Sequence, residues 1–257
     1  MKTIEYPEVK QVVVSGDIHG DFRGLVYKLC IQYGYTDTLL IVAGDCGFGF
    51  DKPGYYETIY NHVAGRLRKA NNYIVFVRGN HDDPSYFSQE KVQFKRWRCV
   101  PDYSVIRAAG HAVLCVGGAV SIDRKMRQQE NAIKEMYGHK ETALWWPDEA
   151  PVFRPEEIAA IPADVRIDTV VTHSAPSFCQ PHTKGGLKEW ALFDPAIYAD
   201  TDAERETLDK LADALREHPV RKWFYGHYHL SHSWEQIFTD LRSIWFHMLY
   251  IMEFSEV

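Results

Sequence analysis

Five short motifs, spread along the chain from residue 16 to residue 229, place aspartate, asparagine or histidine beside glycine or at the end of an apolar run. They occupy residues 16–20 (Gly-Asp-Ile-His-Gly), 44–47 (Gly-Asp-Cys-Gly), 79–82 (Gly-Asn-His-Asp), 172–173 (Thr-His) and 226–229 (Gly-His-Tyr-His). Carboxylate and amide oxygens combined with imidazoles suit Mn²⁺, Fe or Zn²⁺ better than Ca²⁺, which prefers oxygen ligands alone. Together these residues suggest a preorganised metal cluster, and a cluster of that kind does hydrolytic chemistry.

Strands are needed to bring these distant motifs together. The motifs follow runs of residues that are typical of buried strands: 11–15, 39–43, 73–77, 169–172 and, in a shorter and more aromatic form, 222–225. Each motif alone is a weak signal, since such residues can form a turn and a buried histidine is more often hydrogen-bonded than metal-bound. Their co-occurrence at successive strand ends favours a site for two metal ions.

The elements around the motifs alternate between strand and helix in the first half of the chain. Periodic apolar residues predict helices at 21–33 and 55–70 between the first three strands, so we expect parallel pairing with right-handed crossovers. Further elements are predicted as a hairpin of 104–108 and 112–116, helices at 124–137, 155–160 and 202–217, and strands at 232–237 and 243–249. Parallel strands first and antiparallel strands last suggest a single α/β domain, residues 1–257, with two sheets packed face to face and helices outside.

The motif series resembles the calcineurin-like metallophosphoesterase superfamily. The family pattern is Asp-x-His, Gly-Asp, Gly-Asn-His followed by Asp or Glu, a later His, and Gly-His-x-His, and all five blocks occur here in order over essentially the whole chain. A looser similarity, in the Gly-Gly pair at 117–118 with the Ser-x-Asp-Arg and Trp-rich segments after it, is to small bacterial and phage-borne members. The resemblance implies a two-sheet β-sandwich flanked by helices, in four layers.

The resemblance also implies which residues hold metal. Two sets of ligands would share one bridging aspartate: Asp17, His19 and His229 for one ion, Asn80, His173 and His227 for the other, and Asp45 for both. His81 would not bind metal but would lie beside the scissile phosphate, with Asn80 also at the substrate. The expected cofactors are two metal ions, and the sequence does not choose between Mn, Fe and Zn.

The expected reaction is hydrolysis of a phosphate ester by attack of a hydroxide that bridges the two ions. Two ions that share a water lower its pKa, aim it at phosphorus and neutralise charge on the phosphoryl oxygens. A histidine with a pKa near neutrality can protonate the departing oxygen, and His81 is placed for this beside Asn80. Asp82 or Asp17 could orient His81, and the sequence does not choose between them. A phosphomonoester is slightly preferred as substrate over a phosphodiester or a dinucleotide polyphosphate.

The second motif departs from the Ser/Thr protein phosphatase branch of the family. That branch reads Gly-Asp-x-Val-Asp-Arg-Gly, and residues 44–50 here lack both the second Asp, which supports the catalytic His, and the Arg, which grips phosphate. Their loss argues against a protein phosphatase, although Arg78, just before the third motif, matches that branch and is a predicted substrate contact. Phe48 and Phe50 would make this rim of the site apolar.

Replacement cations could come from residues 121–127, which read Ser-Ile-Asp-Arg-Lys-Met-Arg. A planar guanidinium binds two phosphate oxygens at once, so Arg124 is the predicted substrate contact of this segment. Basic residues are unfavourable in the first turn of a helix unless an anion lies nearby. The alternative is a solvated first helical turn with no role in binding.

Composition narrows the class of protein and its partners. The 257 residues are 46% hydrophobic and 25% charged, as in an ordinary globular protein, and the net charge of −6 argues weakly against a nucleic-acid partner. A small phosphorylated substrate or a phosphoprotein stays compatible, because bound cations would reverse the local charge. Five widely spaced cysteines without a Cys-x-x-Cys pair, together with the lack of a signal peptide or a membrane-length apolar run, predict a cytoplasmic protein without a membrane partner.

A non-catalytic scaffold that keeps the sandwich for protein binding is the alternative from another functional class. Such a protein would be expected to lose His81 or a metal ligand, and all of these residues are present. A nuclease is disfavoured by the acidic balance and by the lack of a basic or aromatic nucleic-acid motif. The sequence therefore favours a metal-dependent phosphoesterase.

Overall fold

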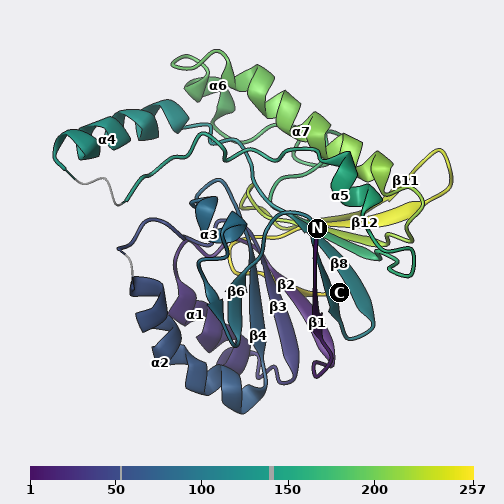
Figure 1. Cartoon of the computed structure of the whole chain (residues 1–257). Helices are drawn as coiled ribbons and strands as arrows, with labels where there is room; N and C mark the ends of the chain where they lie inside the picture. The colour runs from purple at the N-terminus through teal and green to yellow at the C-terminus, as the bar shows by residue number, and fades with distance from the viewer. Residues whose placement is uncertain (53, 139–141) are drawn as a thin grey trace.

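The computed structural model describes residues 1–52, 54–138 and 142–257. Two β-sheets lie face to face, and helices pack against their outer faces (Figure 1). This arrangement confirms the predicted α/β sandwich flanked by helices.

The first sheet carries the three amino-terminal metal motifs. Its strands are β2 (Gln11–Ser15), β3 (Thr38–Ala43), β4 (Tyr73–Val77), β5 (Gln93–Phe94), β6 (Trp97–Cys99) and β13 (Phe254–Glu256). They lie in the order β13-β2-β3-β4-β6-β5. The pairs β2–β3, β3–β4 and β4–β6 are parallel, as expected of the β-α-β-α-β series, and the two edge strands are antiparallel to their neighbours.

The second sheet carries the two carboxyl-terminal motifs. Its strands are β1 (Lys2–Tyr6), β7 (Ser104–Ala108), β8 (His111–Val116), β9 (Thr169–Thr172), β10 (Lys222–Tyr225), β11 (His232–Ile237) and β12 (Ser243–Met248). They lie in the order β1-β7-β8-β9-β10-β12-β11. The expectation that the last strands are antiparallel is wrong for β10 and β12, which pair in parallel. The reason is that β11 forms the sheet edge, so β12 turns back and lies between β10 and β11.

Alternation of side chains along the strands builds three apolar layers. In β3, Leu39 and Ile41 point into the space between the sheets, where Phe224 of β10 meets them. Leu40 and Val42 point the other way, into a cluster beneath the first helices. A third cluster lies on the outer face of the second sheet. Because each buried aliphatic or aromatic side chain contributes about 1.5–3 kcal/mol, these layers hold the sheets and helices together.

Helices cover both outer faces of the sandwich. The first sheet is covered by α1 (Phe22–Tyr27), a π-helical turn η1 (Lys28–Gln32) and α2 (Tyr55–Ala70), and the second by α7 (Ile197–Ala214). Shorter or more peripheral helices are α3 (Ser85–Ser88), α4 (Arg124–Met136), α5 (Pro155–Ala159) and α6 (Leu187–Trp190). Figure 1 shows α1 and α2 on one outer side of the stack and α6 and α7 on the opposite side. Within the described part of the chain, no helix combines the length and apolarity needed to cross a bilayer.

Some elements differ from their predicted boundaries. The helix expected at 21–33 is capped as predicted by Asp21, whose Oδ1 accepts the N–H of Gly24 (2.9 Å), but its second half is the π-helical turn. The helix expected at 202–217 starts at Ile197 and ends at Ala214. The sequence pattern does not predict β1, β5, β6 or β13. These strands are only two to five residues long and lie at or next to a sheet edge, so their apolar signal is short.

The topology places the metal motifs on loops at the carboxyl ends of parallel strands. In the first sheet these strands are β2, β3 and β4, and in the second they are β9 and β10. Loops at such strand ends are the usual ligand-binding region of open α/β sheets.

Candidate metal centre

Four motif residues meet at one point between the sheets. Single ligand atoms of Asp17, His19, Asp45 and His229 all lie within 4.8 Å of one another. The Nε2 atom of His229 is 3.0 Å from Asp17 Oδ2 and 3.0 Å from His19 Nε2. The structure thus brings together three ligands predicted for one ion and the predicted bridging aspartate.

A second group of ligands meets on the other side of Asp45. The Nε2 atom of His173 lies 3.1 Å from Asp45 Oδ1 and 3.1 Å from Asn80 Oδ1. Its Nδ1 atom is 2.7 Å from the carbonyl oxygen of Ala43, which accepts a hydrogen bond from the ring and so directs Nε2 at the two oxygens. Two acceptor oxygens around one ring nitrogen require a hydrogen-bond donor or a cation at that nitrogen.

The pKa of His173 is raised by the neighbouring carboxylates. Burial alone would lower the pKa of the buried ring, but Asp45 and Asp17 raise it to about 9. In the ligand-free protein a proton on Nε2 satisfies the two oxygens. A metal ion that replaces this proton would satisfy the same atoms, so the donor set fits a cation.

His227 completes the second group and contacts a lysine that the motifs do not include. Its backbone N–H donates to Asp17 Oδ1 (2.9 Å). Its Nδ1 and Nε2 atoms lie 3.0 and 3.1 Å from Nζ of Lys184, which also donates to the His227 carbonyl oxygen (3.0 Å). Burial and the ammonium of Lys184 hold the pKa of His227 well below its usual range, so the ring is neutral and able to act as a ligand. Lys184 therefore lies against the imidazole that the second ion would use.

The backbone at four predicted ligands is in the left-handed region. The φ angles are 45° at His19, 46° at Asp45, 66° at His227 and 53° at His229. Residues other than glycine rarely adopt such angles, and strain of this kind concentrates at functional sites. The surrounding fold therefore imposes the directions of these side chains.

Glycines in the motifs allow the loops to pack closely around the ligands. A Cβ atom on Gly226 would lie 2.0 Å from Asp17 Oδ1. A Cβ atom on Gly44, where φ is 99°, would lie 2.2 Å from the ring of His173. Because no side chain fits at either position, glycine is required beside the ligands.

His81 lies at the rim of the same centre. Its backbone N–H donates to Asp45 Oδ1 (2.8 Å), its Nδ1 atom is 3.6 Å from Asp45 Oδ2, and its side chain is 25% exposed. The pKa of His81 is lowered to about 4, chiefly by burial. The charge of Asp45 opposes this shift, and the charges of Arg127 and Lys184 add to it. His81 is therefore neutral near pH 7 in the ligand-free protein.

Asp82 holds backbone rather than the His81 ring. Its carboxylate accepts the N–H groups of Cys46 (3.0 Å), Gly47 (2.7 Å), Phe48 (2.9 Å) and Gly79 (2.7 Å). It therefore ties the second motif loop to the third. Burial and the charge of Asp45 raise the pKa of Asp82 to about 7. Neither of the two open candidates, Asp82 and Asp17, has a contact with the His81 ring; the carboxylate near its Nδ1 atom is that of Asp45 (3.6 Å). A catalytic role for Asp82 stays a prediction.

Most of the chain matches one protein family. The family model described as calcineurin-like phosphoesterase matches residues 10–231. This chain belongs to the calcineurin-like phosphoesterase family. It is a hydrolase of the metallophosphoesterase type with a candidate metal site, and its Asp/His cluster is typical of the family.

Two solved structures are distantly similar to this phosphoesterase. Phosphopantetheinyl hydrolase (PptH) from Mycobacterium tuberculosis is similar at 14% identity with a TM-score of 0.42, covering 96% of this chain and 91% of that one. A cold-active protein tyrosine phosphatase is similar at 13% identity with a TM-score of 0.34, covering 98% of this chain and 75% of that one. No curated protein sequence matches the chain.

The two arginines predicted to contact substrate have other partners in this phosphoesterase. The guanidinium of Arg78 is buried, donates to Asp102 (2.9 Å) and to the carbonyl oxygens of Glu149 (2.6 Å) and Ala150 (3.0 Å). Substrate contact by Arg78 stays a prediction, and it would require these bonds to break.

Arg124 is likewise paired. It forms ion pairs with Asp194 (2.5 Å) and Asp200 (2.6 Å). Contact with substrate stays a prediction for Arg124, and it would require phosphate to replace one of these carboxylates. Arg127, one helical turn later, is the arginine of this segment whose charge acts on His81.

Two further sequence expectations concern the rim of the site. Phe48 is fully buried in the core beneath the first helices, so the expectation that it lines the rim is wrong. Phe50 is half-buried and packs edge-on against Trp146, with ring centroids 5.6 Å apart. Lys184, which precedes two glycines outside every motif, carries no sequence signal that would identify it in advance.

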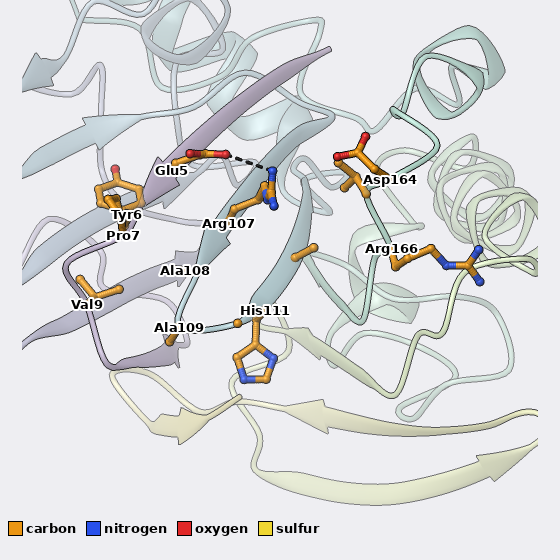
Figure 2. Close-up of a pocket in the computed structure, with 13 residues that line it drawn as sticks. Glu5, Tyr6, Pro7, Val9, Arg107, Ala108, Ala109, His111, Asp164 and Arg166 are labelled. Atoms are coloured by element: carbon orange, nitrogen blue, oxygen red, sulfur yellow. Dashed lines mark hydrogen bonds and ion pairs between the residues drawn. The ribbon is translucent and has the colours of Figure 1, made fainter.

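A separate cavity of about 440 Å³ lies at the other end of the second sheet (Figure 2). The turn of the β7–β8 hairpin forms part of its lining, whereas the metal centre lies toward the carboxyl end of β8. Arg107 pairs with Glu5 (3.1 Å) in its wall, and the lining His111 pairs with Asp168 (3.1 Å). None of the predicted metal ligands lines this cavity, so it is distinct from the candidate active site.

Proposed function

We propose that this chain is a dinuclear metal-dependent phosphoesterase. The single observation that carries the proposal is that Asp45 belongs to both ligand groups. It lies within 4.8 Å of the ligand atoms of Asp17, His19 and His229, and its Oδ1 atom is 3.1 Å from Nε2 of His173. A carboxylate shared by two groups is suited to bridge two ions.

The predicted donors supply chemistry that suits phosphate ester hydrolysis. Oxygen-bearing side chains combined with imidazoles suit Mn²⁺, Fe or Zn²⁺. Two such ions, when bound, would acidify a water nucleophile and neutralise charge on the phosphoryl group. The protein would contribute by holding its ligands in fixed directions, through the left-handed backbone and the hydrogen bond from His173 to Ala43.

His81 would act on the departing oxygen. Its Nδ1 atom faces Asp45, which leaves Nε2 to donate a proton. The pKa of about 4 in the ligand-free protein, set first by burial, would rise when the negative phosphate of a substrate lies beside the ring. Substrate binding would therefore favour protonation of His81, and this proton would pass to the leaving group.

Two cations near His81 support a phosphomonoester as the preferred substrate. Arg127 and Lys184 lower the pKa of His81, whereas Asp123, which pairs with Arg127 (2.8 Å), raises it. A monoester has a second pKa of about 6 and so carries one more negative charge than a diester near pH 7. Two nearby cations stabilise a doubly charged phosphate group more than a singly charged one.

Substrate ranking tests the proposal. Purified, Mn²⁺-loaded protein is assayed with p-nitrophenyl phosphate, bis-p-nitrophenyl phosphate and a dinucleoside polyphosphate, and kcat/KM is expected to be highest for the monoester. The Lys184→Met variant should lose more activity on the monoester than on the diester, whereas Lys188→Met, an exposed position on α6, serves as the control. Preference for either of the other substrates would support the diesterase or dinucleotide polyphosphate alternative. No turnover of any substrate by protein that holds two ions would support the scaffold alternative.

A further inference from the structure

The side-chain amide of Asn80 uses both of its ends. Its oxygen Oδ1 faces the metal centre, 3.1 Å from Nε2 of His173, and its nitrogen Nδ2 donates to Oγ of Ser121 (2.8 Å). The two ends of an amide are alike in size, but only the oxygen can bind a cation. Affinity for a metal ion therefore depends on what prevents this amide from turning over.

A buried glutamate sets the direction of the bond between Ser121 and Asn80. The Ser121 hydroxyl donates to Oε2 of Glu149 (2.6 Å), and the Ser121 backbone N–H donates to Oε1 (2.8 Å). An ionised carboxylate only accepts hydrogen bonds, so the single hydroxyl proton of Ser121 is directed at Glu149. The hydroxyl can then offer only lone pairs to Asn80, and lone pairs accept the amide nitrogen rather than the oxygen.

The segment that carries Ser121 is fixed in place. The N–H of Ala119 donates to the carbonyl oxygen of Glu149 (3.2 Å), and the N–H of Val120 donates to the carboxylate of Glu204 on α7. Ser121 is 2% exposed and Glu149 3% exposed. Because the two residues before Ser121 are held and its own N–H is bonded to Glu149, the hydroxyl cannot move away from Asn80 without breaking buried hydrogen bonds.

We propose that Ser121 and Glu149 are positioning residues that fix the orientation of the Asn80 amide and thereby set the affinity of the ion held by Asn80, His173 and His227. The inference rests on the proposed function, because it requires Asn80 to be a metal ligand. Partners of this kind change metal affinity by about 10- to 100-fold when they are removed.

Equilibrium titration of metal-free protein with Mn²⁺ tests the inference without an activity assay. The titration is done at pH 8, because burial raises the pKa of Glu149 to about 7 and the carboxylate must be ionised. Wild type is expected to bind two ions. Ser121→Ala removes the acceptor for the Asn80 nitrogen and should weaken one of the two ions at least tenfold. Glu149→Gln should weaken the same ion, because the new amide can donate to Ser121 and free its hydroxyl proton to face the Asn80 oxygen.

Ser104→Ala is the matched control. Ser104 is also buried, and its hydroxyl donates to the carbonyl oxygen of Pro101 (2.7 Å), with no contact to a predicted ligand. This variant should lose a similar part of the free energy of unfolding and keep both metal affinities. A purely structural role for Ser121 would produce the same result as this control.

The outcomes separate the inference from the proposed function. If wild type does not bind two ions, the proposed dinuclear centre fails. If wild type binds two ions and both Ser121→Ala and Glu149→Gln bind them with unchanged affinities, the inference alone is overturned. If Ser121→Ala does not fold, as judged by urea unfolding, Glu149→Gln decides, since it keeps the volume and the backbone contact of the native side chain.

Discussion

The Nε2 atoms of His19 and His229 lie 3.0 Å apart, although the two residues are separated by 210 positions in the chain. His19 follows β2 of the first sheet, and His229 follows β10 of the second. Two imidazole nitrogens approach this closely only when a proton or another cation lies between them or beside them. The contact marks the point at which both sheets contribute to one site.

Asp45→Asn should impair metal binding itself and not only a step of turnover. An amide keeps one oxygen for the His81 N–H but has half the acceptor capacity and no charge to bridge two ions. We expect loss of at least one ion and a fall in kcat of more than about 100-fold. Metal content after dialysis and kcat are measured together, with the exposed Asp202→Asn on α7 as control. Full metal occupancy in Asp45→Asn would contradict the bridging role.

His81→Ala should separate metal binding from turnover. The ring is not among the ligands, so both ions should stay bound, whereas loss of the proton donor should lower kcat by about 10²–10⁴-fold. His62→Ala is the control, because it removes an exposed histidine of α2 that is not part of the predicted site. A folded His81→Ala protein with normal turnover would rule out the assigned role.

Gly226→Ala should damage the centre through space alone. The added methyl group would lie 2.0 Å from Oδ1 of Asp17, so either the loop or the carboxylate must move, which costs about 1–3 kcal/mol of unfolding free energy and weakens metal binding. Gly65→Ala, in the middle of α2 with open space around it, should instead stabilise the protein by about 1 kcal/mol. Urea unfolding and a Mn²⁺ titration of both variants check the contrast, and equal behaviour of the two would refute it.

Glu149 should make the stability of the metal-free protein depend on pH. Burial raises its pKa from 4.5 to about 7, so between these values the folded state holds a proton that the unfolded state releases. The free energy of unfolding should therefore fall as pH rises from 4.5 to 7, by about 3 kcal/mol from this group, and be unaffected by it above that range.

The Glu149→Gln variant lacks this titration. Its unfolding free energy should depend less steeply on pH between about 5 and 7 than that of wild type, whereas both should run parallel between about pH 7.5 and 8.5. Urea midpoints at half-unit pH intervals measure the difference. Parallel curves through the whole range would show that Glu149 is ionised in the folded protein throughout.

Local patterns predicted the parts of the fold that depend on burial. The strands Gln11–Ser15 and Tyr73–Val77 and the helix Tyr55–Ala70 have the boundaries that their apolar periodicity predicts. The direction in which strands pair could not be predicted in this way, because the apolar pattern of β12 is the same whether the strand lies parallel or antiparallel to β10. The order of strands in a sheet depends on contacts between distant segments, which a local pattern does not contain.

The same distinction holds for the site. The convergence of Asp17, His19, Asp45 and His229 follows from motifs whose residue types and order carry the information. Lys184 lies outside any motif and Ser121 outside the five metal motifs, so their contacts with the site depend on how distant segments fold together. Arg124 illustrates the reverse case: its chemistry suits phosphate, but the fold places Asp194 and Asp200 against it.

The ligands of the candidate centre are divided between the two layers of the sandwich, with Asp17 and Asp45 on one and His173 and His227 on the other. An ion bound among them would act as a cross-link at the open end of the stack, between layers that adhere through a large apolar interface. Release of the ion and parting of the layers at these strand ends would then be linked events, so a shortage of metal would also loosen the contact between the two sheets there.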